Sequence, residues 1–283
     1  MMKVLLAGAT GYLGKYIAKE LVNQKYFLRV LVRNPEKFKR FDIPVNEIIN
    51  AEVTRSSTLT NCFNDIDVVI STVGITKQKD GLTYMDVDYQ ANLNLLEEAK
   101  KSGVKKFIYV SVLNGEKLKA TKICYAKEKF VERLKNSGIE YCVVRPNGFY
   151  SDIAEFLKMA EKGHVYLFGK GELKSNPIHG EDLAKVCVSA INTRTKEIEV
   201  GGPETLTQNQ IAEITFEALG KRPKIIHFPD WIRNMVLNIS KLILSEKSYG
   251  PIEFFLTVMG IEMVAPEYGN HTLLSYFKTL STQ

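Results

Sequence analysis

The sequence predicts an α/β protein with a doubly wound parallel sheet, helices on both faces, and a smaller C-terminal substrate lobe. Two observations favour this fold. An apolar run at residues 3–7 leads directly into a glycine turn and then a helical pattern. Strand-like and helix-like segments then alternate six times up to residue 146. This alternation is typical of parallel sheets joined by right-handed crossovers, which bind ligands at the carboxyl ends of their strands.

The first strand, at 3–7, is followed by Gly8, Gly11 and Gly14 and by a helix at 15–22. Such a turn points backbone N–H groups and the positive end of a helix dipole at one place, which suits a pyrophosphate. We expect Gly8 to permit the tight turn, Gly11 to leave room for the phosphate, and Gly14 to let the helix pack closely. The segment therefore predicts dinucleotide binding in a Rossmann domain. The alternative is a glycine-rich turn with a structural role only.

The second strand, at 28–32, ends at Arg33, where NAD-selective sites carry an acid that binds the ribose 2′-hydroxyl. A carboxylate would repel a 2′-phosphate, whereas a guanidinium can pair with it through two N–H donors. Lys37 follows one helical turn later. We therefore expect NADP(H) to be preferred over NAD(H). The alternative is that Arg33 is an ordinary surface residue.

The remaining elements of this half are recognised by apolar runs for strands and by good caps or helical spacing for helices. The strand that ends at Gly74 is nearly continuous in apolar residues, as buried parallel strands are. The elements are strands at 47–49, 67–74, 106–111 and 141–144, and helices that begin at 56–58 and span 85–102 and 122–136.

After residue 146 the alternation loosens, so we expect a cofactor domain at 1–150 and a lobe at 151–283 that does not fold independently. Thr207 is a good N-cap for one helix of this lobe. Residues 227–283 are rich in aromatic side chains and poorly periodic. The expected elements are helices at 152–162, 180–192 and 207–220 and a strand at 197–200.

The composition, with 45% hydrophobic and 25% charged residues, is ordinary for a soluble globular protein. We expect a cytoplasmic location, in which cysteines stay reduced. The net charge of +6 is spread along the chain, so we expect no nucleic-acid partner. The four cysteines form no C-x-x-C pair and are expected to be reduced thiols. The four histidines are far apart in the sequence, which predicts no metal site.

Residues 231–244 place apolar side chains on one side of a helix, interrupted by Arg233 and Lys241. The interruptions exclude a membrane span. We expect such a helix to cover an apolar substrate pocket or to form a contact in a homodimer rather than to bind a membrane surface.

Four residues are candidates for the chemistry of a hydride-transfer enzyme: Tyr125, Lys129, Ser111 and Lys127. Tyr125 and Lys129 stand four residues apart on one helical face, where an ammonium group would make the phenol a better acid. Ser111 ends the preceding strand and could orient a substrate carbonyl. Lysines crowd this helix, and Lys127 is a rival for the lysine that binds the cofactor ribose. The spacing of these residues is compatible with either Lys127 or Lys129 as the lysine that binds the cofactor ribose.

Together these motifs resemble the short-chain dehydrogenase/reductase superfamily, in particular its extended and atypical members. The resemblance covers almost the whole chain. It is carried by the three glycines, Arg33, Val110-Ser111, the Tyr125/Lys129 helix, the segment 145–150, the segment 176–184, Gly201-Gly202-Pro203-Glu204 and the segment 265–269.

Within this branch the chain looks most like divinyl chlorophyllide reductases and related NAD(P)H-binding reductases. The resemblance implies NADPH-dependent reduction of a small or medium apolar, carbonyl-containing or unsaturated substrate, with Lys127 as the ribose-binding lysine. Glu52 stands where the family often has an aspartate near the adenine, which is one departure from the family pattern. Ser111 is followed by Val112 rather than by a second hydroxyl residue, a departure also found in NmrA-like proteins that bind NADP and sense redox state without catalysis.

The leading hypothesis is thus an NADP(H)-dependent oxidoreductase acting on a small-molecule substrate. The alternatives are an NADP(H)-binding redox sensor and an enzyme like the nucleotide-sugar epimerases and dehydratases. We expect apolar substrate contacts from Tyr150, Phe156, Phe168 and Ile178. The residues predicted to bind the cofactor are Gly8, Thr10, Gly11, Tyr12, Leu13, Gly14, Arg33, Lys37, Glu52, Val73, Gly74, Lys127, Pro146, Asn147 and Phe149.

Overall fold

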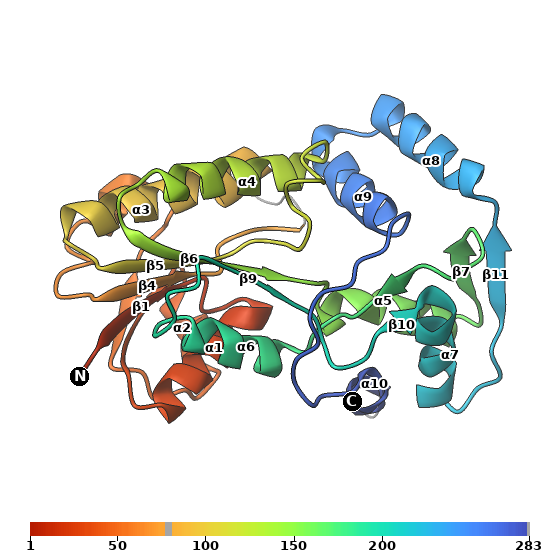
Figure 1. Cartoon of the computed structure of the whole chain (residues 1–283), viewed down its shortest axis with the longest axis horizontal. Helices are drawn as coiled ribbons and strands as arrows, with labels where there is room; N and C mark the ends of the chain where they lie inside the picture. The colour runs from red at the N-terminus through yellow and green to blue at the C-terminus, as the bar shows by residue number, and fades with distance from the viewer. Residues whose placement is uncertain (77–80, 282–283) are drawn as a thin grey trace. The chain divides into compact units, whose positions relative to one another are not determined.

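A computed structural model of the chain describes residues 1–76 and 81–281. It confirms the predicted parallel α/β fold (Figure 1). In this part of the chain, one sheet contains seven strands in the order β3-β2-β1-β4-β5-β6-β9. The chain order reverses at β1, which pairs in parallel with both β2 and β4. The strands are β1 Lys3–Ala7, β2 Phe27–Val32, β3 Glu47–Asn50, β4 Val68–Ser71, β5 Lys106–Val110, β6 Glu140–Pro146 and β9 Glu197–Val200.

Helices cover both faces of this sheet, as the sequence pattern predicts. Helices α3 (Asn92–Lys101) and α4 (Lys122–Lys135) lie on one face, and α1 (Tyr12–Asn23) lies on the other with residues 183–189 of α6 (Gly180–Ser189) (Figure 1). A short helix, α2 (Pro35–Lys39), follows β2. Because both faces are covered, all five residues of β5 are buried.

The helix expected at 85–102 consists of two parts. Met85–Ala91 forms a π-helical turn, and α3 continues from Asn92. The Asn92 amide donates hydrogen bonds to the carbonyl oxygens of Val73, at 3.0 Å, and Asp88, at 3.0 Å. A wide turn leaves backbone carbonyls available, and the Asn92 side chain satisfies them while tying the turn to the end of β4. Turns of this kind occur frequently at functional sites.

The helix expected to begin at 56–58 is a single 3₁₀ turn, η1, Ser56–Leu59. The Thr58 hydroxyl donates to the carbonyl oxygens of Glu52, at 2.9 Å, and Arg55, at 2.8 Å. Its hydrogen bonds therefore hold the preceding loop instead of capping a longer helix.

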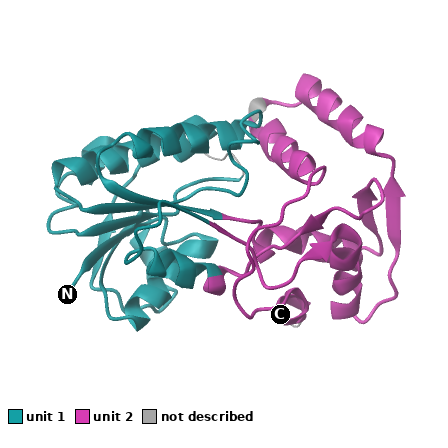
Figure 2. Ribbon diagram, viewed as in Figure 1, with its two compact units in different colours: residues 1–145, 183–198 teal, residues 146–182, 199–283 magenta. Residues whose placement is uncertain are grey.

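The chain divides into two compact units, coloured separately in Figure 2. The first unit comprises residues 1–145 and 183–198, and the second comprises 146–182 and 199–283. This division differs from a single boundary at residue 150. Residues 183–198, which include most of α6 and the first half of β9, return to the first unit because apolar residues of α6 are buried and β9 extends the sheet beside β6.

The second unit has its own core, built from apolar residues such as Phe156, Leu167 and Phe216. Among its described residues, β7 pairs in parallel with β11, and β8 pairs antiparallel with β10. Thr207 caps α7 as predicted, since its side chain accepts a hydrogen bond from the backbone N–H of Gln210. The elements are α5 Tyr150–Glu161, β7 Val165–Phe168, β8 Lys174–Ser175, β10 Leu206–Thr207, α7 Gln208–Ala218, β11 Ile225–Phe228, α8 Asp230–Ile243, α9 Glu246–Val258 and α10 Leu273–Ser281.

Helix α8 carries an apolar face that is exposed. Trp231 is 63% exposed and Leu242 is 84% exposed, whereas the buried residue of this helix is Ser240. The C-terminal region that is poorly periodic in sequence is largely helical, since it contains α8, α9 and α10. Pro251 lies inside α9 and is one reason for the weak helical pattern of that segment. Within the described ranges, no helix combines the length and the apolar character needed to cross a membrane.

Candidate functional site

The glycine turn after β1 is packed so closely that side chains would not fit at two positions. Gly8 has φ +88°, and a Cβ there would lie 2.4 Å from Thr72 Oγ1. A Cβ on Gly14 would lie 2.1 Å from the Gly8 carbonyl oxygen and 2.8 Å from Ala9 Cα. Helix α1 can therefore rest against the turn only because residue 14 is glycine.

Gly11 stands at the N-cap of α1 and donates its backbone N–H to the Gly8 carbonyl oxygen at 3.0 Å. A Cβ at Gly11 would meet that oxygen at 3.3 Å, so this position is less crowded than Gly14. The following residues, Tyr12 and Leu13, begin the helix, and Thr10 precedes the cap. The first backbone N–H groups of a helix have no intrahelical acceptor, so the turn can receive an anion.

Arg33 directly follows β2, and its side chain is exposed. One guanidinium nitrogen lies 3.7 Å from Glu52 Oε2, so two residues predicted to bind the adenosine part of the cofactor lie side by side. Lys37 is exposed in α2, where its backbone N–H donates to the Asn34 side chain at 3.0 Å. The arrangement leaves the cationic groups of Arg33 and Lys37 accessible to an anionic ligand.

Beyond the end of β4, Gly74 lies beside two charged side chains. A Cβ on Gly74 would lie 2.6 Å from Asp88 Oδ1 and 2.9 Å from Lys127 Nζ. Lys127 Nζ in turn lies 3.0 Å from Asp88 Oδ1, and the Lys127 side chain is 13% exposed. Val73, which precedes Gly74, is buried. Three elements thus converge here: the end of β4, the π-helical turn and α4.

The environment keeps Lys127 charged. Burial alone would lower its pKa, but the neighbouring Tyr109 and Asp88 outweigh that effect and raise the pKa of Lys127. Its Nζ lies 5.5 Å from the centroid of the Tyr109 ring. Burial raises the pKa of Asp88, and the Lys127 ammonium opposes this change. The site therefore holds an ammonium donor beside Gly74, which lies three residues beyond the end of β4.

Tyr125 and Lys129, the candidate acid and its neighbour, lie on a different part of α4. Tyr125 is 51% exposed, and the Lys129 ammonium lies 5.8 Å from its ring centroid. The same ammonium lies 4.9 Å from the ring centroid of Tyr89. These contacts place Lys129 against aromatic faces rather than against the phenolic oxygen, whereas Lys127 is the lysine that the fold brings to Gly74.

Ser111 belongs to a buried charge network. Its hydroxyl donates to Glu128 Oε1 at 2.9 Å, and Glu128 also accepts two hydrogen bonds from Arg145, at 2.6 and 2.9 Å. Arg145 Nε reaches Glu197 at 2.7 Å, which connects β6 to β9. The Ser111 side chain therefore belongs to the hydrogen-bond network that links β5, α4 and β6. Its hydroxyl could orient a substrate carbonyl only after breaking its hydrogen bond to Glu128.

Three residues predicted to bind the cofactor, Pro146, Asn147 and Phe149, lie between the end of β6 and the start of α5. The Asn147 amide donates to Asn176 Oδ1 at 2.8 Å and to the Met263 carbonyl oxygen, and its own oxygen accepts from Gly148 N. Pro146 ends β6, and the backbone N–H of Phe149 donates to Asp152 at 3.4 Å. The Asn147 side chain thus stabilises the loops around it.

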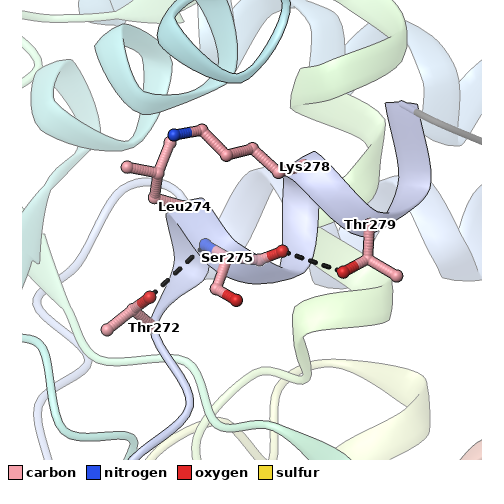
Figure 3. A pocket seen from close by; sticks show the side chains of 5 residues that line it. All are labelled: Thr272, Leu274, Ser275, Lys278 and Thr279. Carbon is pink, nitrogen blue, oxygen red and sulfur yellow. Dashed lines mark hydrogen bonds between the residues drawn. The ribbon is translucent and has the colours of Figure 1, made fainter.

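The aromatic and apolar residues expected to contact the substrate are mostly interior. Tyr150, Phe156 and Ile178 are buried in the second unit, and the Tyr150 hydroxyl donates to the His271 carbonyl oxygen at 2.6 Å. An open hollow of about 480 Å³ lies instead along α10. Figure 3 shows five residues that line it: Thr272, Leu274, Ser275, Lys278 and Thr279.

Two histidines that are distant in the sequence meet in the second unit. The rings of His179 and His271 are stacked, with centroids 4.2 Å apart. The prediction of no metal site depends on the separation of the histidines along the chain. His179 and His271 are nevertheless neighbours in the folded protein. No spacing rule could have found the pair, because His271 lies on a loop before the last helix.

Asp88 is the residue of the first unit that the sequence reasoning missed. It precedes Asn92 by one helical turn on a helix that follows a glycine-ended strand. That position, at the carboxyl edge of the sheet, is the signal that could have identified it.

Comparison with known proteins yields a family match and similar chains. Residues 8–194 match the sequence model of a family described as NAD(P)H-binding. Divinyl chlorophyllide a 8-vinyl-reductase, chloroplastic, of Arabidopsis thaliana is 26% identical over 304 residues, with 96% of this chain and 72% of that protein covered. Photosystem II assembly factor Ycf39 of Trieres chinensis is 26% identical over 243 residues, with 84% and 76% covered.

Among solved structures, the NADPH-dependent quinone oxidoreductase QOR2 of Escherichia coli, complexed with NADPH, is similar in fold. Its TM-score is 0.73 at 18% identity, and the match covers 98% of this chain and 99% of that one. At this identity the likeness establishes the shared fold.

Proposed function

The chain belongs to the NAD(P)H-binding family, and from that premise we propose that it is a reductase that uses NADPH to reduce a small or medium apolar carbonyl or unsaturated substrate. Its resemblance to the short-chain dehydrogenase/reductase superfamily is confirmed. The relative from Arabidopsis thaliana is itself named a reductase. This supports reduction as the reaction type.

The observation that carries the proposal is the convergence of Gly74, Asp88 and Lys127 at the carboxyl end of the sheet. Ligands of open parallel sheets bind at this edge, on the side where Gly8 to Gly14 also lie. An ammonium group held there suits the hydroxyl groups of a cofactor ribose. We therefore assign the ribose to Lys127 rather than to Lys129.

Three further parts fit a bound NADPH. The turn from Gly8 to Gly14, which has no room for a side chain at Gly8 or Gly14, would receive the pyrophosphate. The exposed Arg33 guanidinium would pair with the 2′-phosphate, and its neighbour Glu52 would lie near the adenosine. When bound, the cofactor supplies hydride, and the protein supplies position and charge.

A second candidate function is favoured by the surroundings of Ser111 and Tyr125. The Ser111 hydroxyl is bonded to Glu128, and Tyr125 is half exposed. A chain in which neither group meets the substrate could bind NADP(H) and sense its redox state without turnover. The epimerase alternative lacks such support, since it requires a firmly held NAD, which the Arg33 cation disfavours.

One experiment separates these functions. The purified chain is titrated with NADPH and with NADH by fluorescence, and NADPH absorbance is then followed with quinones, enones and tetrapyrroles as candidate substrates. The reductase proposal expects tighter NADPH binding and consumption with at least one class, lost in Lys127→Ala. Tight binding without consumption across the panel would support the sensor instead.

A further inference from the structure

Two histidines and a glutamate come together in the second unit, outside the site described above. His179 immediately precedes α6, Glu181 lies in the first turn of α6, and His271 lies on the loop before α10. One ligand atom from each residue lies within 4.8 Å of the other two. Glu181 Oε2 is 3.7 Å from His271 Nε2. The cluster therefore joins two segments that are far apart in the sequence.

Asp182 fixes the orientation of the His271 ring. One carboxylate oxygen, Oδ2, lies 2.9 Å from His271 Nδ1 and accepts the backbone N–H groups of Asn270 and His271, each at 3.1 Å. A carboxylate can only accept here, so Nδ1 carries the proton and Nε2 holds the lone pair. That nitrogen is directed to the side where Glu181 lies. Histidines that bind metals are commonly oriented by a carboxylate in this way.

The backbone around these groups is tightly held. The Asp182 side chain is 1% exposed, and a Cβ on Gly269 would lie 2.2 Å from its Oδ2. The His179 ring packs 5.8 Å from the ring of Tyr150 and 5.6 Å from that of Tyr276, measured between centroids. In contrast, the Glu181 side chain is half exposed and can adjust its position.

We propose that His179, Glu181 and His271 bind a divalent transition-metal ion of the zinc class, with water as the fourth ligand. Two imidazoles and one carboxylate are a typical donor set for Zn²⁺. Bonds of about 2.0–2.2 Å require the ligand atoms to approach by about 1 Å, which the Glu181 side chain and ring rotations can supply. The ion would clamp the loop before α10 to the start of α6, and this inference does not depend on the proposed reductase function.

The test uses the full chain, freed of metal with a chelator that is then removed. Zn²⁺ is titrated by calorimetry, and Co²⁺ is titrated by visible absorbance. We expect one equivalent to bind, a Co²⁺ spectrum of a low-symmetry four-coordinate site, and a rise in the melting temperature with Zn²⁺ because the ion binds the folded state.

Glu181→Gln and His271→Ala should abolish the Co²⁺ spectrum. Asp182→Asn should weaken Zn²⁺ binding by about 10–100-fold, the range for residues that orient a metal ligand. His227→Ala and His164→Ala are matched controls outside the cluster and should bind normally. If His271→Ala does not fold, Glu181→Gln decides, since its side chain is half exposed. Absence of binding, or binding that Glu181→Gln leaves unchanged, would overturn the proposal.

Discussion

The ammonium of Lys127 lies 3.0 Å from Asp88 Oδ1, and the two charges meet beside a glycine that leaves them space. Their elements differ: Asp88 is in the π-helical turn and Lys127 is in α4. A buried ion pair contributes little net stability, but removing one partner is costly because the other charge stays buried. We therefore infer that the main role of Asp88 is to position the Lys127 ammonium beside Gly74.

Lys127→Met should weaken NADPH binding strongly, whereas Lys129→Met should leave it nearly unchanged. Loss of a hydrogen bond from a charged group costs about 1.5–3 kcal/mol, which corresponds to roughly a ten- to hundredfold weaker Kd. Fluorescence titration of both variants measures the contrast. Melting curves identify any loss of folding. Equal effects of the two substitutions would contradict the assignment of the ribose to Lys127.

Asp88→Asn should destabilise the fold and change how NADPH binding depends on pH. Without the carboxylate, burial acts on Lys127 with less opposition, so the pKa of Lys127 falls. The ammonium then loses its proton at lower pH than in the wild-type chain, and NADPH affinity should decline earlier as pH rises. The loss of folding stability should approach about 3 kcal/mol. Parallel pH profiles of Kd for the variant and the wild type would rule out this positioning role.

Arg33→Ala should weaken NADPH binding much more than NADH binding, because only NADPH carries the 2′-phosphate. The expected loss for NADPH is roughly ten- to hundredfold, as for one charge-assisted contact. Lys39→Ala is a matched control, since this exposed lysine is paired with Glu36 at 2.7 Å. The measurement is Kd for both cofactors, and equal losses for the two would refute the 2′-phosphate assignment.

Gly14→Ala and Gly11→Ala should separate packing from ligand space. A Cβ added at Gly14 would meet the Gly8 carbonyl oxygen at 2.1 Å, so we expect a clear fall in melting temperature. At Gly11 the corresponding distance is 3.3 Å, so the fold should be retained while NADPH binding is lost. Thermal melts and cofactor titrations of both variants test this. Normal NADPH affinity in Gly11→Ala would contradict the assignment of the pyrophosphate to this turn.

Asp182 should stabilise the fold at neutral pH and lose this effect in acid. Burial alone would raise its pKa, but the hydrogen bonds from His271 and Asn270 outweigh burial and lower the pKa. Stability from this group is therefore present above the unfolded pKa of about 3.9 and is lost as pH falls through the lowered value. The difference in unfolding free energy between wild type and Asp182→Asn, measured with chelator present, should shrink below about pH 4. A difference in unfolding free energy between wild type and Asp182→Asn that stays constant from neutral pH to about pH 3 would contradict this assignment.

The sequence predicts the parallel sheet and the glycine turn because both depend on local pattern. Gly8 and Gly14 are recognisable because they stand between an apolar run and a helical pattern, and the apolar run at β4 is typical of a buried strand. The choice between Lys127 and Lys129 could not be made this way, because it depends on which side of α4 faces Asp88. The meeting of His179 with His271 depends on the path of the last loop, which leaves no periodic signal.

The return of residues 183–198 to the first unit affects the order in which the two units can fold during synthesis and whether the chain can be cut into two stable fragments. Residues 1–145 leave the ribosome before β9 has been synthesised. The sheet of the first unit can therefore be completed only after residues 146–182 have also been synthesised. A fragment cut after residue 150 would expose the hydrogen-bonding edge of β6 and the apolar surface that α6 covers. The chain crosses between the units after residues 145, 182 and 198, so no single cut yields two pieces that each contain one complete unit.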